Sequence, residues 1–129
     1  MASGGRARSR QRVSPLVDIV SQAADSLNAR DIVALDLRGL NDATDWFVIA
    51  SGTSDTHVRG IANAVQRRLE EAGVRPHHVE GLAAGRWVLL DLVDIVVHVF
   101  HPEARAFYQL ERLWDDAPRL QPAAERKSP

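Results

Sequence analysis

Residues 45–55 read Asp45-Trp-Phe-Val-Ile-Ala-Ser-Gly-Thr-Ser-Asp55, and they carry the most informative structural signal in the chain. Residues 45–50 are apolar on both sides of an extended chain, which predicts a strand at the centre of a sheet. Gly52 follows at once, and the hydroxyl of Thr53 or Ser54 is typical of the residue that caps a helix start. The stretch therefore predicts a buried strand that runs directly into a helix.

Helical spacing of apolar residues, at steps of three and four, predicts three helices. Ser14-Pro15 opens the first, whose apolar residues run from Val17 to Leu27. The second follows Ser54 and ends at Gly73, a residue typical of helix C-termini. The third begins at Pro102, and its inward side is predicted to consist of Ala106, Phe107, Leu110, Leu113 and Trp114.

Short apolar runs predict the strands of one sheet. They lie at residues 31–37, 45–50, 74–80, 87–91 and 94–100, and Pro76 places the third of them at a sheet edge. The resulting order of helices and strands predicts the α+β class, α/β-like on a looser definition. We expect a single domain with one mixed sheet of about five strands flanked by helices.

Charge divides the 129 residues into a folded body and two tails. Residues 1–12 hold four arginines and no acid, and residues 118–129 are also basic, so both are predicted to be disordered tails around a domain at 13–117. Residues 13–116 hold nine arginines and sixteen carboxylates, a net charge of −7. Such a body repels phosphate backbones, which predicts a basic protein partner and RNA contact at most through the tails.

Several classes of protein are excluded by composition. The chain has no cysteine, so disulfide frameworks and cysteine-ligated metals are not expected. It has no apolar run of about 18 residues and no secretory signal, which predicts a cytoplasmic protein without a membrane partner. The arginine-rich, lysine-poor composition indicates a bacterial source. His98 and His101, three positions apart on a strand, point to opposite faces, as do the neighbours His77 and His78. No metal or cofactor is therefore predicted.

An enzymatic alternative rests on Gly52-Thr-Ser-Asp55. A glycine and serine between strand and helix favour phosphate, and nucleotidyltransferases use such an element together with paired carboxylates that hold metal ions. Here the next strand offers only Glu80, while Asp91 and Asp94 flank a turn and fit turn formation. A small nucleotide-binding protein of nucleotidyltransferase type remains the alternative, and no catalytic residue is predicted.

The predicted hairpin at residues 87–100 is apolar on both faces, so one face needs a cover or a partner. Its aromatic and charged residues have the character of a protein-binding patch, but the centre of a well-covered sheet explains them equally well. The candidate partner-binding residues are Glu80, Gly81, Trp87, Leu89, Asp91, His98 and Phe100.

Six stretches together resemble the ribosomal silencing factor, or iojap, family over residues 16–117. They are Ala34–Leu40, Asp45–Asp55, Val79–Gly81, Arg86–Asp91, Asp94–His101 and Ala106–Trp114. The resemblance implies a nucleotidyltransferase-like fold without the catalytic carboxylates. It also implies binding to the large ribosomal subunit on ribosomal protein fourteen, which sterically blocks joining of the small subunit and represses translation under nutrient limitation. The free protein is expected as a monomer or a homodimer.

One position departs from the family pattern. Where the family carries a glycine between the two aspartates of the hairpin turn, this chain has Val93 between Asp91 and Asp94. A β-branched residue disfavours positive φ, so the geometry of this turn is expected to differ or to be strained.

Overall fold

The computed structural model describes residues 14–120, which form four helices and six strands. The helices are α2 (Pro15–Ser26), α3 (Asp55–Glu71), α4 (Pro102–Tyr108) and α5 (Leu110–Leu113). The strands are β1 (Arg30–Asp36), β2 (Trp46–Ser51), β3 (His78–Glu80), β4 (Trp87–Asp91), β5 (Ile95–Phe100) and β6 (Arg119–Leu120). Within this part of the chain, no helix has the length and apolar character needed to cross a membrane.

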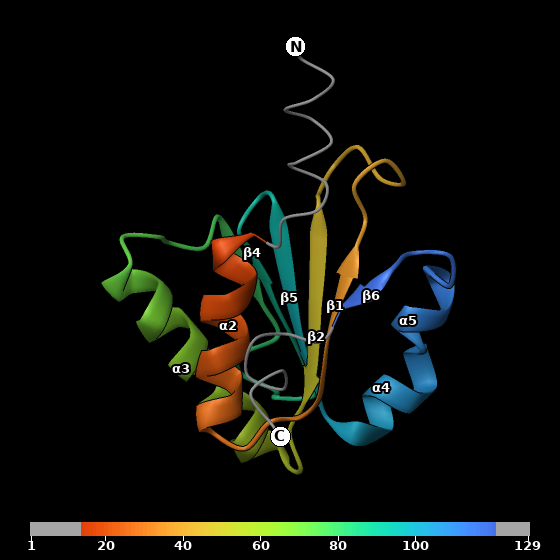
Figure 1. The fold of residues 1–129 in the computed structure, drawn as a ribbon. Coiled ribbons are helices and arrows are strands. Elements are labelled where there is room, and N and C mark those ends of the chain that lie inside the picture. Colours follow the sequence, from red (N-terminus) through yellow and green to blue (C-terminus); the bar gives the residue numbers. More distant parts are fainter. Residues whose placement is uncertain (1–13, 121–129) are drawn as a thin grey trace, which may run out of the picture.

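The strands form one mixed sheet in the order β3-β4-β5-β2-β1-β6 (Figure 1). β2 and β5 are parallel at the centre, and every other neighbouring pair is antiparallel. The helix α3 connects the central strand β2 to the edge strand β3. The β4–β5 hairpin then lies between β3 and β2 in the sheet. The predicted α+β class with one mixed sheet is confirmed.

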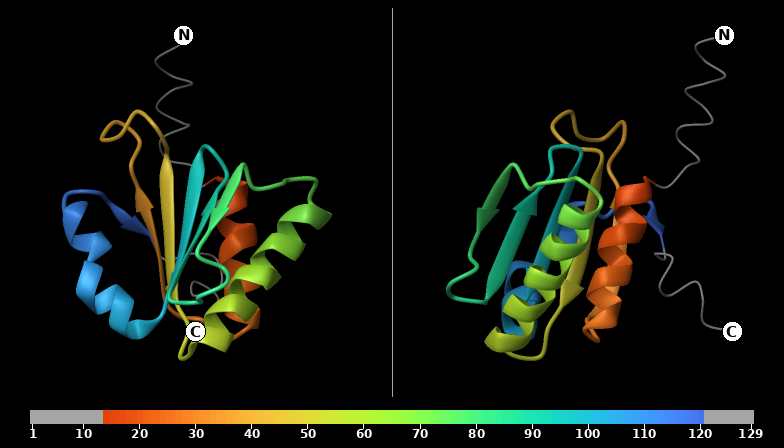
Figure 2. Two further views of the ribbon diagram at one scale, coloured as in Figure 1. Left: turned by 180° about the vertical axis from the view of Figure 1, so that it is seen from behind. Right: turned by 90° about the vertical axis from the view of Figure 1, so that its left-hand side faces the viewer.

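Helices pack on both faces of the sheet, and the two layers are unequal (Figure 2). α2 and α3 cover one face, where a large cluster of buried residues includes Val48, Leu90 and Val97 from the central strands. α4 and α5 lie against the other face, where the buried cluster is smaller and draws on β1, β2 and β5. The second face is therefore only partly covered.

The predicted helix ends are confirmed. Ser14 accepts a hydrogen bond from the Leu16 N–H at the start of α2, and Ser54 accepts one from the His57 N–H at the start of α3. Gly73 follows α3 with a φ of 81°, in the left-handed region that favours glycine. These caps fix where the strand at residues 45–50 gives way to a helix.

Two strand predictions are wrong. The edge strand expected at residues 74–80 is reduced to His78–Glu80, because β4 ends at Asp91, whose carbonyl accepts from the His77 N–H at 2.7 Å and leaves no β4 residue for the positions before it. Residues 118–120 were expected in a tail, but Arg119 and Leu120 pair with Leu35 and Ala34 of β1 as β6. The predicted tails otherwise fall at residues 1–12 and 121–129, outside the described residues.

The third helix is also not the continuous one that the spacing predicts. Gln109 adopts a φ of 46°, and this left-handed residue separates α4 from α5. The break turns the predicted apolar side outward: Phe107 is 78% exposed and Leu113 is 74% exposed, while Ala104 is buried instead. Leu110 and Trp114 do pack against the sheet, as predicted.

An ion pair holds α4 and α5 together across this break. The Arg105 guanidinium donates from Nε and Nη2 to both carboxylate oxygens of Glu111, at 3.1 and 2.9 Å. Its Nη1 also donates to the Ser51 hydroxyl at the end of β2, at 2.8 Å. The hydrogen bonds from Arg105 lower the pKa of Glu111. This arrangement fixes both helices to the sheet and limits how far they extend across it.

Candidate functional site

The sheet register brings the predicted binding residues to one face. Trp87 lies opposite Phe100, and Leu89 lies opposite both His98 on β5 and Glu80 on β3. Cross-strand partners point to the same side of a sheet, so these side chains share the face on which α4 and α5 pack. Asp91, two positions beyond Leu89 on β4, points to this side as well.

Two of these residues are covered and do not reach the surface. Phe100 is fully buried and His98 is 3% exposed. Phe100 belongs to the cluster that α4 closes with Ala104, and His98 lies between the rings of Trp87 and Phe47. The prediction that both contact a partner directly is therefore wrong, because the C-terminal helices bury this part of the sheet.

The rest of this face is open. Leu89, Asp91 and Trp87 are partly exposed on β4, and Glu80 is exposed on β3. We define the open sheet face as the set of residues that surround Leu89 on this side, with the α4 residues that border them. These are Glu80, Trp87, Leu89, Asp91, Val96, Phe107 and Tyr108.

Val96, Phe107 and Tyr108 were missed as members of this surface by the sequence analysis. Val96 lies opposite Asp91 and is partly exposed. Tyr108 is 51% exposed, and its ring lies 4.7 Å from that of Trp87. With Phe107 these rings line a pocket of about 510 Å³ whose rim carries Arg86 and Glu103. No glycine or proline marks the helix break at Gln109, so the spacing of apolar residues could not predict that Phe107 is exposed.

Trp87 belongs both to the fold and to the surface. Its ring stacks on Phe100 at 4.9 Å with an interplanar angle of 30°, and its Nε1–H donates to Nδ1 of His98 at 3.1 Å. The side chain is nevertheless partly exposed. Trp87 therefore contributes to the packing of this face and is also accessible on it; its contact with a partner stays a prediction.

Gly81 shapes this surface without being part of it. Its φ is 82°, and a Cβ at this position would collide with the carbonyl oxygen of Trp87. Only glycine tolerates both conditions, so the chain turns sharply behind the first residue of β4. Gly81 therefore positions Trp87 and offers no side chain to a partner.

The hairpin turn at the far end of the face is strained. Val93 has a φ of 75°, and the Asp94 N–H donates to the Leu92 carbonyl at 3.0 Å across it. This is the geometry of a γ-turn, which is uncommon for any residue and worse for a β-branched one. Asp91 stabilises it, because its Oδ1 accepts a hydrogen bond from the Val93 N–H at 2.8 Å.

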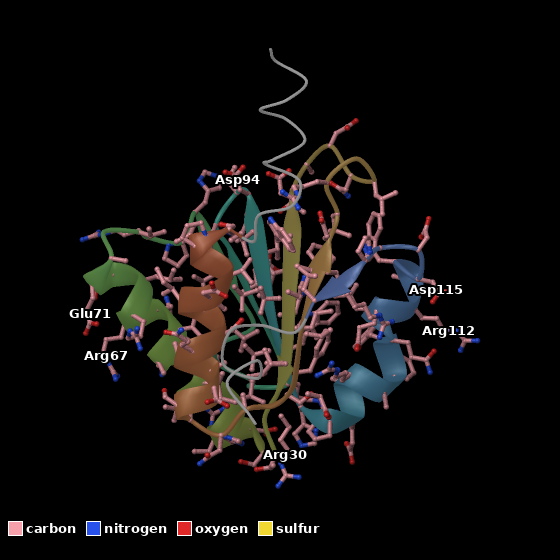
Figure 3. The ribbon with its side chains drawn as sticks, viewed as in Figure 1. Arg30, Arg67, Glu71, Asp94, Arg112 and Asp115 are labelled. Carbon is pink, nitrogen blue, oxygen red and sulfur yellow. The ribbon has the colours of Figure 1, made fainter. Side chains whose placement is uncertain are left out.

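The junction at Gly52–Asp55 does not resemble a phosphate site. The Thr53 N–H donates to Nδ1 of His57 at 2.8 Å, and the His57 N–H donates to the Ser54 hydroxyl, so these donors are already used within the chain. The carboxylates do not converge on it either. Asp94 lies at the opposite end of the sheet from the start of α3 (Figure 3), and Asp91 is at that same distant end of β4.

Individual histidines also make separate contacts within the protein. His101 accepts a hydrogen bond from the Glu103 N–H at the start of α4, and His78 pairs with Glu80 at 2.6 Å. His57 bridges Thr53 to the Leu27 carbonyl at the end of α2. Among residues 14–120, no three histidine, aspartate or glutamate side chains come together as a metal site requires.

These observations define a small α+β protein whose distinctive surface is a half-covered sheet face with partly exposed aromatic and apolar residues. A family model described as "Ribosomal silencing factor during starvation" matches residues 10–129. The chain belongs to this family.

Relatives and solved structures agree with that assignment. The ribosomal silencing factor RsfS of Bacillus subtilis is 44% identical over 80% of this chain and 87% of its own. The mouse protein named "Mitochondrial assembly of ribosomal large subunit protein 1" is 33% identical over 76% of this chain and 44% of its own. A crystal structure from Chromobacterium violaceum matches with a TM-score of 0.78 and 36% identity, over 81% of this chain and 87% of that one.

Proposed function

We propose that this protein binds the large ribosomal subunit through the open sheet face, docks on ribosomal protein fourteen and sterically blocks joining of the small subunit. Translation is thereby repressed under nutrient limitation. The family supports silencing of the ribosome, and the name of the mouse relative refers to the large subunit. The choice of ribosomal protein rests on the resemblance described above.

The observation that carries the proposal is the uncovered half of the sheet. Partly exposed Leu89 and Val96 lie beside the aromatic rings of Trp87 and Tyr108, an arrangement typical of the centre of a protein interface. Asp91 and Glu80 place carboxylates around this apolar centre. The net charge of −7 on residues 13–116 favours approach to a basic protein and disfavours RNA.

Binding is tested by sedimentation of the protein with purified large and small subunits. We expect it to sediment with large subunits only. Leu89→Arg places a bulky positive charge at the centre of the open sheet face, and we expect it to weaken binding at least about tenfold. Leu89 is already partly exposed, so the melting temperature should stay near that of the wild type.

The matched control is Leu27→Arg. Leu27 is 37% exposed at the end of α2, in the helix layer on the opposite side of the sheet. This variant should bind like the wild type. Full binding by Leu89→Arg, or equal loss in both variants, would show that the open sheet face is not the interface.

A further inference from the structure

Trp87 is held in one orientation by contacts on several sides. Its ring lies on Phe100, at 4.9 Å between centroids, and Tyr108 packs against it at 4.7 Å. Its Nε1–H donates to Nδ1 of His98 at 3.1 Å. Nε1 is the one polar atom of the indole, and it is already used within the protein. The exposed part of Trp87 is therefore a ring surface without a hydrogen-bond donor to offer.

His98 can accept the hydrogen bond from the Trp87 indole in one protonation state only. Nδ1 must carry a lone pair to accept from the indole, so the proton of the neutral ring is on Nε2. Burial lowers the pKa of His98 to about 4, and the imidazole is therefore neutral at physiological pH. The ring of Phe47 lies across it at 4.6 Å and 69°.

Packing alone does not explain a histidine at position 98. Its Nε2 is buried and has no hydrogen-bond partner among residues 14–120. A buried donor without a partner costs stability, and an apolar side chain of similar volume would avoid this cost at Nε2, although it would also remove the acceptor of the Trp87 N–H. The hydrogen bond to Trp87 is the specific contribution of the imidazole at this position.

We propose that His98 is a positioning residue of the docking surface: it holds the indole of Trp87 by its N–H, so that the ring is presented to the partner in a fixed orientation. This inference rests on the proposed function. Fixing an aromatic side chain before binding reduces the conformational entropy lost on association. It also implies that the partner contacts the ring of Trp87 with an apolar or cationic group, since no donor remains for an acceptor.

The test compares His98→Leu, which removes the acceptor at similar volume, with His98→Asn, whose side-chain oxygen restores an acceptor near the Nδ1 position. Three quantities are measured: the melting temperature, hydrogen exchange of the Trp87 indole N–H by NMR, and affinity for large subunits. For His98→Leu we expect faster exchange at Trp87 and unimpaired melting. We expect affinity to fall about fivefold to tenfold, the loss typical of releasing one ordered side chain. His98→Asn should recover most of that affinity.

The outcomes separate this inference from the proposed function. Wild-type affinity in His98→Leu, with binding lost in Leu89→Arg, would overturn the role of His98 and leave the docking surface intact. Wild-type affinity in both would overturn the proposed function. If His98→Leu does not fold, His98→Met takes its place, because its thioether is only a weak acceptor. Unfolding of both would show that His98 is a structural residue and would equally overturn the proposal.

Discussion

The imidazole of His98 lies beneath Trp87 with 3% of its surface exposed, and burial lowers its pKa from 6.5 to about 4. In the unfolded chain this histidine takes up a proton near pH 6.5, whereas in the folded protein it stays neutral until about pH 4. The unfolded state therefore binds more protons in this window. Stability is fully present above it and is lost as the pH falls.

This linkage predicts a measurable difference between the wild type and His98→Asn. The free energy of unfolding of the wild type should fall by roughly 2 kcal/mol more than that of the variant between about pH 7 and about pH 4.5. Glu111, whose pKa is lowered by Arg105, also loses its contribution to the free energy of unfolding at acid pH, and this loss is common to both proteins. Urea unfolding at the two pH values measures the difference. Parallel losses would show that His98 titrates normally in the folded state.

For individual residues, the sequence indicates which side chains lie together at the candidate site better than it indicates which of them are exposed. Trp87, Leu89, Asp91 and Glu80 do lie together on one side of the sheet. His98 and Phe100 occupy alternate positions of their strand and point to the same face, yet they are buried. Both strands of the hairpin are apolar on both faces, so the local pattern carries no information about where α4 stops covering the sheet. That limit depends on a left-handed Gln109 and on the contacts of Arg105 with Glu111 and Ser51.

At the scale of elements, the β4–β5 hairpin offers a direct test of backbone strain. Val93 is 55% exposed and adopts a φ of 75°, so its side chain contributes little packing while its backbone is strained. Val93→Gly should stabilise the protein by about 1 kcal/mol, because relief of strain exceeds the entropy cost of glycine. Thermal melting should rise by about 4 °C or more. A lowered melting temperature would mean that Val93 is not strained in this turn.

The two-residue strand β6 gives a second prediction at this scale. Pro118 accepts a hydrogen bond from the Asp36 N–H at 2.9 Å, and Arg119 and Leu120 pair with β1. Removal of residues 118–129 should therefore lower the melting temperature by about 5 °C or more, roughly 1 kcal/mol. Removal of residues 121–129 alone is the control and should have little effect, as their polar composition predicts. Equal melting of both truncated proteins would show that β6 contributes nothing.

The elements that the sequence predicted are those with strong local signals. α2 and α3 have an apolar stripe and a serine cap, and β2 is a continuous apolar run. β6 has no such signal, because two residues form a strand only through a partner more than 80 positions earlier in the chain. Residues 74–76 have a strand-like composition, but β4 ends at Asp91, which lies opposite His78 and accepts from the His77 N–H, so they lie beyond the end of the strand with which they would pair.

In the molecule as a whole, the two faces of the sheet are covered to different extents. One is closed by α2 and α3 around a large apolar cluster that stabilises the domain. The other is closed only over β1, β2 and part of β5, which leaves Leu89 and its neighbours partly exposed. The steric obstruction proposed above would use this aromatic and apolar surface of an acidic domain and would need no catalytic group.

Under the proposed function, a protein bound to the large subunit through the open sheet face prevents subunit joining. The most direct measurement incubates large subunits with the wild type, Leu89→Arg or Leu27→Arg, adds small subunits, and follows the fraction of joined ribosomes by density-gradient sedimentation. We predict that the wild type and Leu27→Arg reduce this fraction in proportion to protein bound, and that Leu89→Arg does not. Joining at the normal level on large subunits saturated with wild-type protein would show that binding does not block the small subunit.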